Sequence, residues 1–272
     1  ARAWNEVGVA CPALTRSPQR ISADGSWLEK PLHGSGGAGI RVWREAARDV
    51  AGLGKYFQKH VPGMPCSAVF VGAQGRCVLL GATWQLVGTA WTGAGKFCYA
   101  GSIGPIEPRA ELDDQWQRIG GAITQQFQLA GLFGVDGVLD GGELWPIEVN
   151  PRYPASVEVL ERALGLHAVG MHVDACRRGR LPAAVPRTST RWCGKAVHYA
   201  SADVLVAREF EAFAAEEATC WPWPNLADVP HPGTWIRRTR PVATVLAEAP
   251  DEESLRGLLR DRMESLQRAL YR

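Results

Sequence analysis

The sequence predicts a mixed α+β fold built from antiparallel strands and amphipathic helices. Short segments rich in Val, Ile, Leu and aromatic residues are separated by turns containing Gly, Asp or Pro, a pattern typical of hairpin-connected strands. Two longer segments, 111–131 and 251–270, repeat apolar residues at helical spacing. The length of 272 residues is enough for one or two domains.

The elements of the first half follow from turn signals and β-rich composition. In chain order we predict a strand at 26–30, a glycine-rich segment at 33–39, a short helix beginning at 42–50, a strand at 57–63 that ends in a Pro-Gly turn, and strands at 67–71 and 77–87 joined by an Ala-Gln-Gly turn.

The second half alternates predicted helices and strands. We predict a helix at 111–131, a hairpin at 134–150 with an Asp-Gly turn, helices at 156–164 and 167–178, strands at 195–200 and 243–249, and a helix at 251–270. The last helix begins with three acidic residues, which suit a helix N-terminus, and aligns Leu255, Leu259, Met263, Leu266 and Leu270 on one stripe.

Composition excludes several classes of function. Thirty basic and 28 acidic residues give a net charge of +2, which is too balanced to indicate nucleic acid or a membrane surface as partner. No apolar run approaches the roughly 18–20 residues of a membrane span. The seven cysteines are scattered without a CxxC pair, which favours reduced, mostly buried thiols over disulfides or zinc. We therefore expect a cytoplasmic protein.

A glycine-rich loop follows Lys30 directly. Gly34, Gly36, Gly37 and Gly39 let the backbone approach a ligand closely and present N–H groups to one point, which suits polyphosphate oxygens. Lys30 ends the preceding strand and adds a compact positive charge. The P-loop pattern is absent because the lysine precedes the glycines, and the dinucleotide pattern fits poorly. The alternative is a flexible surface loop.

The hairpin at 134–150 places acidic side chains on two paired strands. Glu148 and Asn150 share one face of their strand, and the intervening residues point to the other. If the hairpin loop comprises residues 141–143, Asp136 lies directly opposite Glu148, which is destabilising unless a cation sits between them. Carboxylates suit Mg²⁺, Asn150 adds a neutral oxygen, and Arg152 offers a planar fork for a phosphate or carboxylate. The alternative is a solvated face with an incidental acid pair.

Together these residues resemble the ATP-grasp superfamily, and within it the predicted ATP-dependent carboligases related to biotin carboxylase. The family pattern is a strand lysine with a glycine-rich flap, a hinge strand, and an acidic strand pair ending in E-x-N-x-R. This sequence matches it in order and spacing with Lys30 and 34–39, then 58–61, then Asp136 and 148–152. The match covers roughly residues 1–175, and segments within 227–245 look like the family's C-terminal region.

The resemblance implies a role for each matching residue. Lys30 would contact the phosphates of ATP, and Gly34, Gly36, Gly37 and Gly39 would form the flap. Gln58 and Val61 would meet adenine through backbone atoms, with Lys59 beside them. Asp136, Glu148 and Asn150 would hold Mg²⁺, with Mn²⁺ as an alternative, and Asn150 and Arg152 would act at the reacting phosphate.

The resemblance also implies an architecture in which two subdomains clasp ATP between antiparallel sheets. Residues 1–64 would form the small subdomain with flap and adenine hinge, 65–180 the large subdomain with the metal site, and 181–272 a C-terminal extension packed on it. Family members usually begin with a Rossmann-like domain and a second lysine upstream of the flap. Only 29 residues precede Lys30 here and none is a lysine, so that domain looks missing from this sequence.

The implied activity is that of an ADP-forming ligase, which activates a carboxylate as an acyl-phosphate for attack by an amine or similar nucleophile. Two alternatives remain: a carboxylase that activates bicarbonate, and a nucleotide-binding regulatory subunit without turnover. Expected partners are small-molecule carboxylate and amine substrates, with either a homodimer or a partner chain that supplies the upstream domain. Gln85, Trp91, Lys96, Tyr99 and Ser102 are candidates to line the acceptor pocket, although plain strands and a connecting loop explain them as well.

Overall fold

The computed structural model describes residues 1–44, 54–218 and 223–271, and it divides into two compact units. The first unit comprises residues 1–81, 107–154 and 167–185, and the second comprises 82–106, 155–166 and 186–272. Strand β6 (Arg76–Val87) contributes its first half to one unit and its second half to the other.

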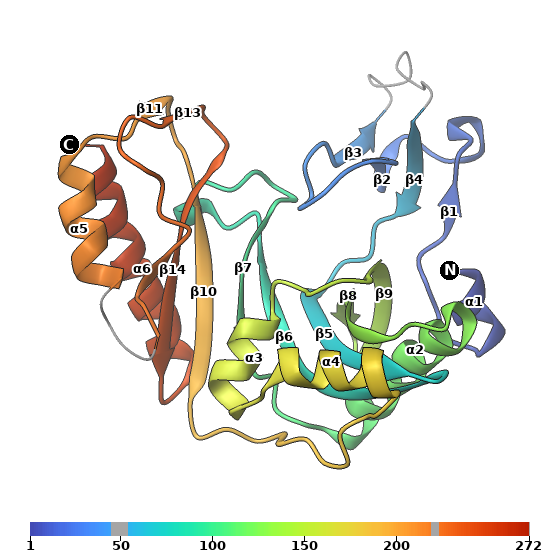
Figure 1. The fold of residues 1–272 in the computed structure, drawn as a ribbon. Coiled ribbons are helices and arrows are strands. Elements are labelled where there is room, and N and C mark those ends of the chain that lie inside the picture. Colours follow the sequence, from blue (N-terminus) through green and yellow to red (C-terminus); the bar gives the residue numbers. More distant parts are fainter. Residues whose placement is uncertain (45–53, 219–222, 272) are drawn as a thin grey trace. The chain divides into compact units, whose positions relative to one another are not determined.

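A small antiparallel sheet forms the N-terminal part of the first unit. Its strand order is β1-β4-β2-β3, as Figure 1 shows, with β1 (Leu14–Thr15), β2 (Asp24–Pro31), β3 (Arg41–Arg44) and β4 (Lys55–Lys59). Glu29 on β2 is buried and forms ion pairs with Arg41 and Lys55, at 2.7 and 2.9 Å. Because strand neighbours alternate between faces, Lys30 points to the opposite face of this sheet from Glu29.

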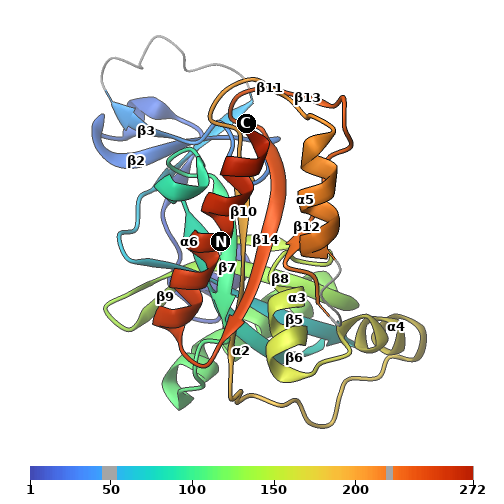
Figure 2. The same cartoon turned by 90° about the vertical axis from the view of Figure 1, so that its left-hand side faces the viewer.

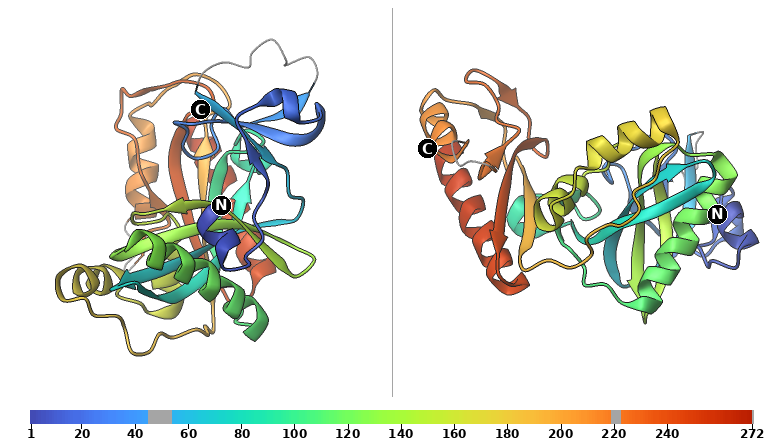
Figure 3. Two further views of the ribbon diagram at one scale, coloured as in Figure 1. Left: turned by 90° about the vertical axis from the view of Figure 1, so that its right-hand side faces the viewer. Right: turned by 60° about the horizontal axis from the view of Figure 1, so that its bottom comes forward.

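The second sheet of the first unit carries the larger core. Its order is β6-β5-β8-β9, with β5 (Met64–Ala73), β8 (Gly131–Asp140) and β9 (Glu143–Asn150). Helices α2 (Ala110–Phe127) and α4 (Ala168–Arg178) pack on it, and Phe70 stacks on Phe133 with ring centroids 5.0 Å apart. Helix α1 (Arg2–Glu6) lies beside α2 (Figure 3), where the Trp4 indole donates a 3.1 Å hydrogen bond to the Ile119 carbonyl. A 3₁₀ turn, Pro18–Arg20, lies between β1 and β2.

The second unit is a sheet covered on one face by the last helix. Its strand order is β12-β14-β10-β7-β6, in which the strands not yet given are β7 (Tyr99–Gly104), β10 (Trp192–Tyr199), β12 (Leu226–Ala227) and β14 (Pro241–Ala249). The other elements of this unit are the 3₁₀ turn Ala90–Thr92, the helices α3 (Val157–Leu164), α5 (Glu209–Ala218) and α6 (Glu252–Leu270), and the short strands β11 (Val204–Leu205) and β13 (Trp235–Ile236). Strands β11 and β13 form a separate two-stranded pair. Helix α6 runs along β10 and β14 (Figure 2), and its apolar stripe is fully buried in their core.

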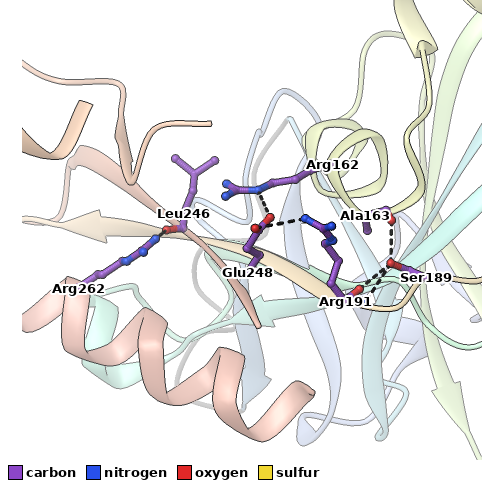
Figure 4. Close-up of polar contacts among 7 residues, drawn as sticks. All are labelled: Arg162, Ala163, Ser189, Arg191, Leu246, Glu248 and Arg262. Atoms are coloured by element: carbon purple, nitrogen blue, oxygen red, sulfur yellow. Dashed lines mark hydrogen bonds and ion pairs between the residues drawn. The ribbon is translucent and has the colours of Figure 1, made fainter. Parts of the chain in front are cut away.

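A polar cluster ties α3 to the strands of the second unit, as Figure 4 shows. The Glu248 carboxylate accepts from Arg162 at 3.0 Å and from Arg191 at 3.3 Å, and the Ser189 hydroxyl donates to the Ala163 carbonyl at 2.7 Å. Arg162 also lies over the Trp223 ring, 5.6 Å from its centroid. These contacts link strands β10 and β14 to the helix that follows the acidic hairpin in the chain.

Most predicted elements are confirmed, with boundaries shifted by a few residues. The final helix is confirmed with its five buried apolar residues, and the Asp251 side chain caps it by accepting from the Ser254 N–H at 2.8 Å. The short helix expected at 42–50 is wrong at its start, because residues 42–44 belong to strand β3; its remainder lies outside the described residues. No helix in the described ranges has the length and apolar character that crossing a bilayer requires.

Candidate functional site

The glycine loop joins β2 to β3 at the edge of the small sheet. Gly36, Gly37 and Gly39 all have positive φ angles of 59°, 81° and 78°, a region that residues with side chains rarely adopt. Two short turns, in which the Ala38 N–H donates to the Ser35 carbonyl and the Ile40 N–H to the Gly37 carbonyl, shape the loop. The backbone conformation therefore depends on glycine at these positions.

Strands β8 and β9 place Asp136 directly opposite Glu148, but by a route that the sequence did not indicate. The loop has two residues, Gly141 and Gly142, because Asp140 pairs with Glu143. A regular ladder from that turn would set Asp136 opposite Ile147. Instead the register shifts between the Gly137–Pro146 and Asp136–Glu148 pairs, so Ile147 is the extra residue of a β-bulge.

The position of Pro146 gives a physical reason for the bulge. Proline has no N–H to donate to a ladder, and within sheets it is confined to edge strands and bulges. Strand β9 is the edge strand of its sheet, and Pro146 directly precedes the extra residue. The predicted pairing of Asp136 with Glu148 is thus confirmed, while the three-residue loop on which it depended is wrong.

Lys30 and the two carboxylates form one electrostatic group. Desolvation, followed by the charge of Asp136, raises the pKa of Glu148, and Lys30 and Arg152 partly offset that rise. Burial lowers the pKa of Lys30, while Glu148 and Asp136 act in the opposite direction. Lys30 is only 8% exposed. The small sheet therefore presents a buried cation to the acidic pair of the second sheet within the same unit.

Asn150 and Arg152 extend this group along the end of β9. The Asn150 amide donates to Asp136 Oδ2 at 3.0 Å, and Asn150 Oδ1 accepts from Arg152 at 2.8 Å. Arg152 is exposed and also donates to the Tyr153 carbonyl at 3.4 Å. The chain Asp136–Asn150–Arg152 fixes the orientation of the acidic residue and leaves the guanidinium accessible to an anion.

The donor set fits a magnesium ion. Mg²⁺ takes oxygen ligands and is usually held by one or two carboxylates together with substrate phosphates. Asp136 and Glu148 supply two carboxylates on facing strands. Among the described residues no group of three or more His, Cys, Asp and Glu side chains could hold a metal ion.

A cavity of about 460 Å³ opens next to this group, still within the first unit. Gln58 lines it from β4, and Ile147 lines it from the bulge. The amides of Lys59 and His60 donate to Ala13 and Ser26, whereas within the described residues the Val61 N–H makes no backbone hydrogen bond. The remaining lining residues, Leu14, Thr15, Arg16, Leu32 and Tyr56, were not identified from the sequence.

These lining residues are brought to the cavity by contacts between segments that are distant in the sequence. Strand β1 has only two residues, and its Leu14 reaches the cavity because it pairs with Gln58, which lies 44 positions later. Tyr56 is a neighbour of the acidic pair, since burial and then the charge of Glu148 raise the pKa of its phenol. No periodicity within a two-residue strand could have indicated this placement.

The acceptor-pocket candidates lie in the second unit. Ser102 pairs with both Gln85 and Lys195 across β7, and its hydroxyl is 2.8 Å from the Tyr99 hydroxyl. Lys195 forms an ion pair with Glu158 of α3. Gln85, Ser102 and Lys195 therefore form a polar row across three strands, with Tyr99 beside it.

Comparisons with known proteins agree on one fold. The chain is similar to L-amino acid ligase from Bacillus licheniformis, with a TM-score of 0.71, 14% sequence identity and coverage of 97% of this chain and 68% of that one. It is similar to N5-carboxyaminoimidazole synthase from Aspergillus clavatus in complex with ADP and 5-aminoimidazole ribonucleotide, with a TM-score of 0.71, 12% identity and coverage of 98% and 71%. It is also similar to the biotin carboxylase domain of 2-oxoglutarate carboxylase from Hydrogenobacter thermophilus with MgADP and bicarbonate, with a TM-score of 0.66, 14% identity and coverage of 97% and 63%. No curated protein sequence matches the chain. The family model of the ATP-grasp domain matches residues 1–156, more than half of the chain. This chain belongs to the ATP-grasp family.

Proposed function

We propose that this protein binds ATP with magnesium and uses it to activate a carboxylate as an acyl-phosphate, which an amine or similar nucleophile then attacks. The observation that supports this most is the facing pair of Asp136 and Glu148 with the buried Lys30 beside them. Two carboxylates held opposite each other destabilise a sheet unless positive charge lies between them. A metal ion with its polyphosphate would meet that requirement.

The nucleotide would lie with its base in the cavity and its phosphates at the acidic pair. Gln58 and Val61 would hold adenine through backbone atoms, with Lys59 beside them, and Leu14, Leu32 and Ile147 would cover the ring. Gly34, Gly36, Gly37 and Gly39 would close over the phosphates. Lys30 would donate to a phosphate oxygen, because its side chain is already desolvated and held among negative charges.

Phosphoryl transfer depends mainly on positioning and on neutralising charge at the transferred group. Bound Mg²⁺ would supply that neutralisation. Asp136, Glu148 and Asn150 would fix its position, and Asn150 would turn its amide oxygen from Arg152 to do so. Arg152, freed from that contact and exposed, would pair with the carboxylate or the transferred phosphate through its planar fork. No protein nucleophile is needed for this chemistry.

Phosphate and ADP release with a panel of acceptors tests this proposal. We expect ADP to form only when magnesium, ATP and a suitable carboxylate are present, and amines such as amino acids to increase turnover. One structurally similar protein is an L-amino acid ligase, which agrees with this expectation. Turnover that requires bicarbonate instead would identify the carboxylase alternative, and tight nucleotide binding without ADP under all acceptors would identify a regulatory subunit.

Glu148→Gln is the decisive variant for the metal assignment. It removes one charged ligand while keeping the side-chain size, and we expect ADP formation to be abolished. Glu143→Gln is the matched control, because Glu143 is exposed and lies on the same strand, directly after the hairpin loop. An undiminished rate in Glu148→Gln, or an equal loss in the control, would contradict the assignment.

A further inference from the structure

Another cavity, of about 120 Å³, lies within the second unit, where helices α5 and α6 adjoin strands β12 and β14 (Figure 2). It is lined from α5 by Phe213 and Glu217, from the strands by Asn225, Leu226 and Val245, and from α6 by Asp261, Arg262 and Ser265. One ordered water requires only about 10–15 Å³. The cavity therefore has room for a small organic molecule.

The floor of this cavity is apolar. Leu226 of β12 and Val245 of β14 pair in register, and both are buried. Phe213 of α5 is half-buried and packs against the same core. An alkyl group suits such a floor, whereas a bare metal ion, which requires several oxygen ligands, does not.

The rim of the cavity carries one carboxylate from each helix. Asn225 holds Glu217 in place, because its backbone N–H donates to the Glu217 carbonyl at 3.0 Å and its side-chain amide donates to Glu217 Oε2 at 3.1 Å. Asp261 is exposed, and the Ser265 hydroxyl donates to its backbone carbonyl at 3.0 Å. Within the described residues the Asp261 carboxylate itself makes no hydrogen bond or ion pair, so it is available to a ligand.

The charge of the lining favours a cation. Its one basic residue, among those the structure describes, is Arg262, which donates to the Leu246 carbonyl of β14 (Figure 4). Two carboxylates and one guanidinium give the lining a net charge of −1 at neutral pH. Glu217 also lies in the last turn of α5, where the helix dipole favours positive charge. The ring of Phe213 can add the attraction between an aromatic face and a cation.

We infer that this cavity binds a small organic amine in its ammonium form. The alkyl chain lies over Leu226 and Val245, and the ammonium group donates to Glu217 and Asp261. An ammonium group has three N–H donors and no acceptor, which suits a rim that offers a carboxylate from each of two helices. The site belongs to the second unit and shares no residue with the nucleotide site that we propose in the first, so the inference does not depend on the proposed function.

Titration of the full chain with n-butylammonium tests the inference, with the methyl signals of Leu226 and Val245 followed by NMR. We expect these signals to shift with a dissociation constant on the order of 1 mM, because a ligand with so few atoms makes few contacts. n-Butanol has nearly the same shape without the charge, and it should bind at least about tenfold more weakly, since it forms no charge-assisted hydrogen bond.

Two variants locate the ammonium group. Asp261→Asn and Glu217→Gln should each weaken butylammonium binding about tenfold, since each removes a charge-assisted hydrogen bond, and should leave butanol binding unchanged. Glu217→Gln keeps a side-chain oxygen that can accept from Asn225, so the contact that holds α5 to the following segment is retained. Thermal unfolding without the amine checks that both variants fold as the unaltered protein does.

Glu264→Gln is the matched control, because Glu264 is exposed on α6, pairs with Arg268 at 3.7 Å and does not line the cavity. Unchanged butylammonium affinity in Asp261→Asn and Glu217→Gln would overturn the inference. An equal loss in Glu264→Gln would overturn it as well, because the amine would then be attracted by the acidic surface in general. Equal affinity for butanol and butylammonium would show an apolar cavity without cation recognition and would also contradict the inference.

Discussion

Lys30 shows how a residue's environment prepares it for a ligand. Its ammonium group is desolvated, which lowers its pKa, and the two acidic side chains nearby hold the charge in place. A cation in that position has already lost most of its water before a phosphate arrives. The contact with phosphate therefore costs less desolvation than it would at an exposed lysine.

Lys30→Met should weaken binding of magnesium nucleotides by about tenfold to a hundredfold, as expected for a charge-assisted contact of roughly 1.5–3 kcal/mol. Calorimetric titration with ADP checks this. Lys55→Met is the control, because Lys55 is on the same sheet but pairs with Glu29 on the opposite face. A comparable loss in both variants would show that general destabilisation of the sheet, rather than a lost phosphate contact, is responsible.

The site residues differ in how far the sequence could predict them. Lys30, the flap glycines and the acidic pair lie in short contiguous patterns that strand alternation and glycine spacing single out, and the family resemblance predicts that they share one site. The pairing of Asp136 with Glu148 was predicted from a three-residue loop, whereas the structure reaches it through a two-residue loop and a bulge. Arg16 and Tyr56 share a cavity only because β1, β4 and β2 adjoin, and that order is not encoded in any local pattern. The β-bulge at Ile147 could not be predicted either, because a single extra residue changes the strand register without changing the hydrophobic pattern of the sequence.

At the scale of elements, helix α6 is fixed at its far end by a buried histidine. His198 on β10 is 1% exposed, and its Nδ1 lies 3.2 Å from the Thr92 carbonyl while its Nε2 lies 3.3 Å from the Tyr271 hydroxyl. The neutral ring with a proton on Nδ1 can donate to Thr92 and accept from Tyr271. Tyr271 follows α6 directly and also accepts from the Ser201 N–H at 2.9 Å.

This arrangement makes stability depend on pH. Burial lowers the pKa of His198 below its ordinary value of 6.5, and the Thr92 contact only partly opposes that shift. The unfolded chain therefore binds a proton as pH falls below about 6.5, whereas the folded chain does not until a lower pH, so the free energy of unfolding decreases in that window. Above pH 6.5 this contribution is fully present.

Urea unfolding at pH 8 and pH 5 checks the prediction with His198→Gln, which removes the titrating group. We expect the stability advantage of the unaltered protein over this variant to shrink as pH falls. His231→Gln is the control, because His231 is exposed in the same unit. A pH-independent difference for His198→Gln would mean that the histidine has the same pKa in the folded and the unfolded chain, and an advantage that grows as pH falls would mean that its pKa is raised in the fold.

At the scale of the whole molecule, the two compact units interleave along the chain. Residues 82–106 belong to the second unit, whereas the segments before and after them, 1–81 and 107–154, belong to the first. Each unit is therefore built from segments that are distant in the sequence. Helical periodicity predicted α2 and α6 well because each helix forms from local contacts. Strand partners could not be read in the same way, because antiparallel pairing between β10 and β7 or β14 joins segments with no shared local signal.

All the residues that we assign to the nucleotide belong to the first unit, which predicts where binding should stabilise the molecule. A ligand at 100 times its dissociation constant adds about 2.7 kcal/mol to the folded state that binds it. We therefore expect MgADP to raise the melting temperature by roughly 5–10 °C if the chain unfolds cooperatively. If the units unfold separately, only the transition of the first unit should move.

Hydrogen exchange with mass spectrometry locates the effect within the chain. MgADP should protect peptides that cover β2 with the flap, β4 with residues 60–61, and β9, because these segments line the proposed site. Peptides of α6 in the second unit serve as the internal control, since their apolar stripe is buried in a core without any assigned nucleotide contact. Protection that is strongest in α6, or absent from β2 and β9, would place the nucleotide elsewhere and remove the basis for assigning Lys30 and Glu148 to it.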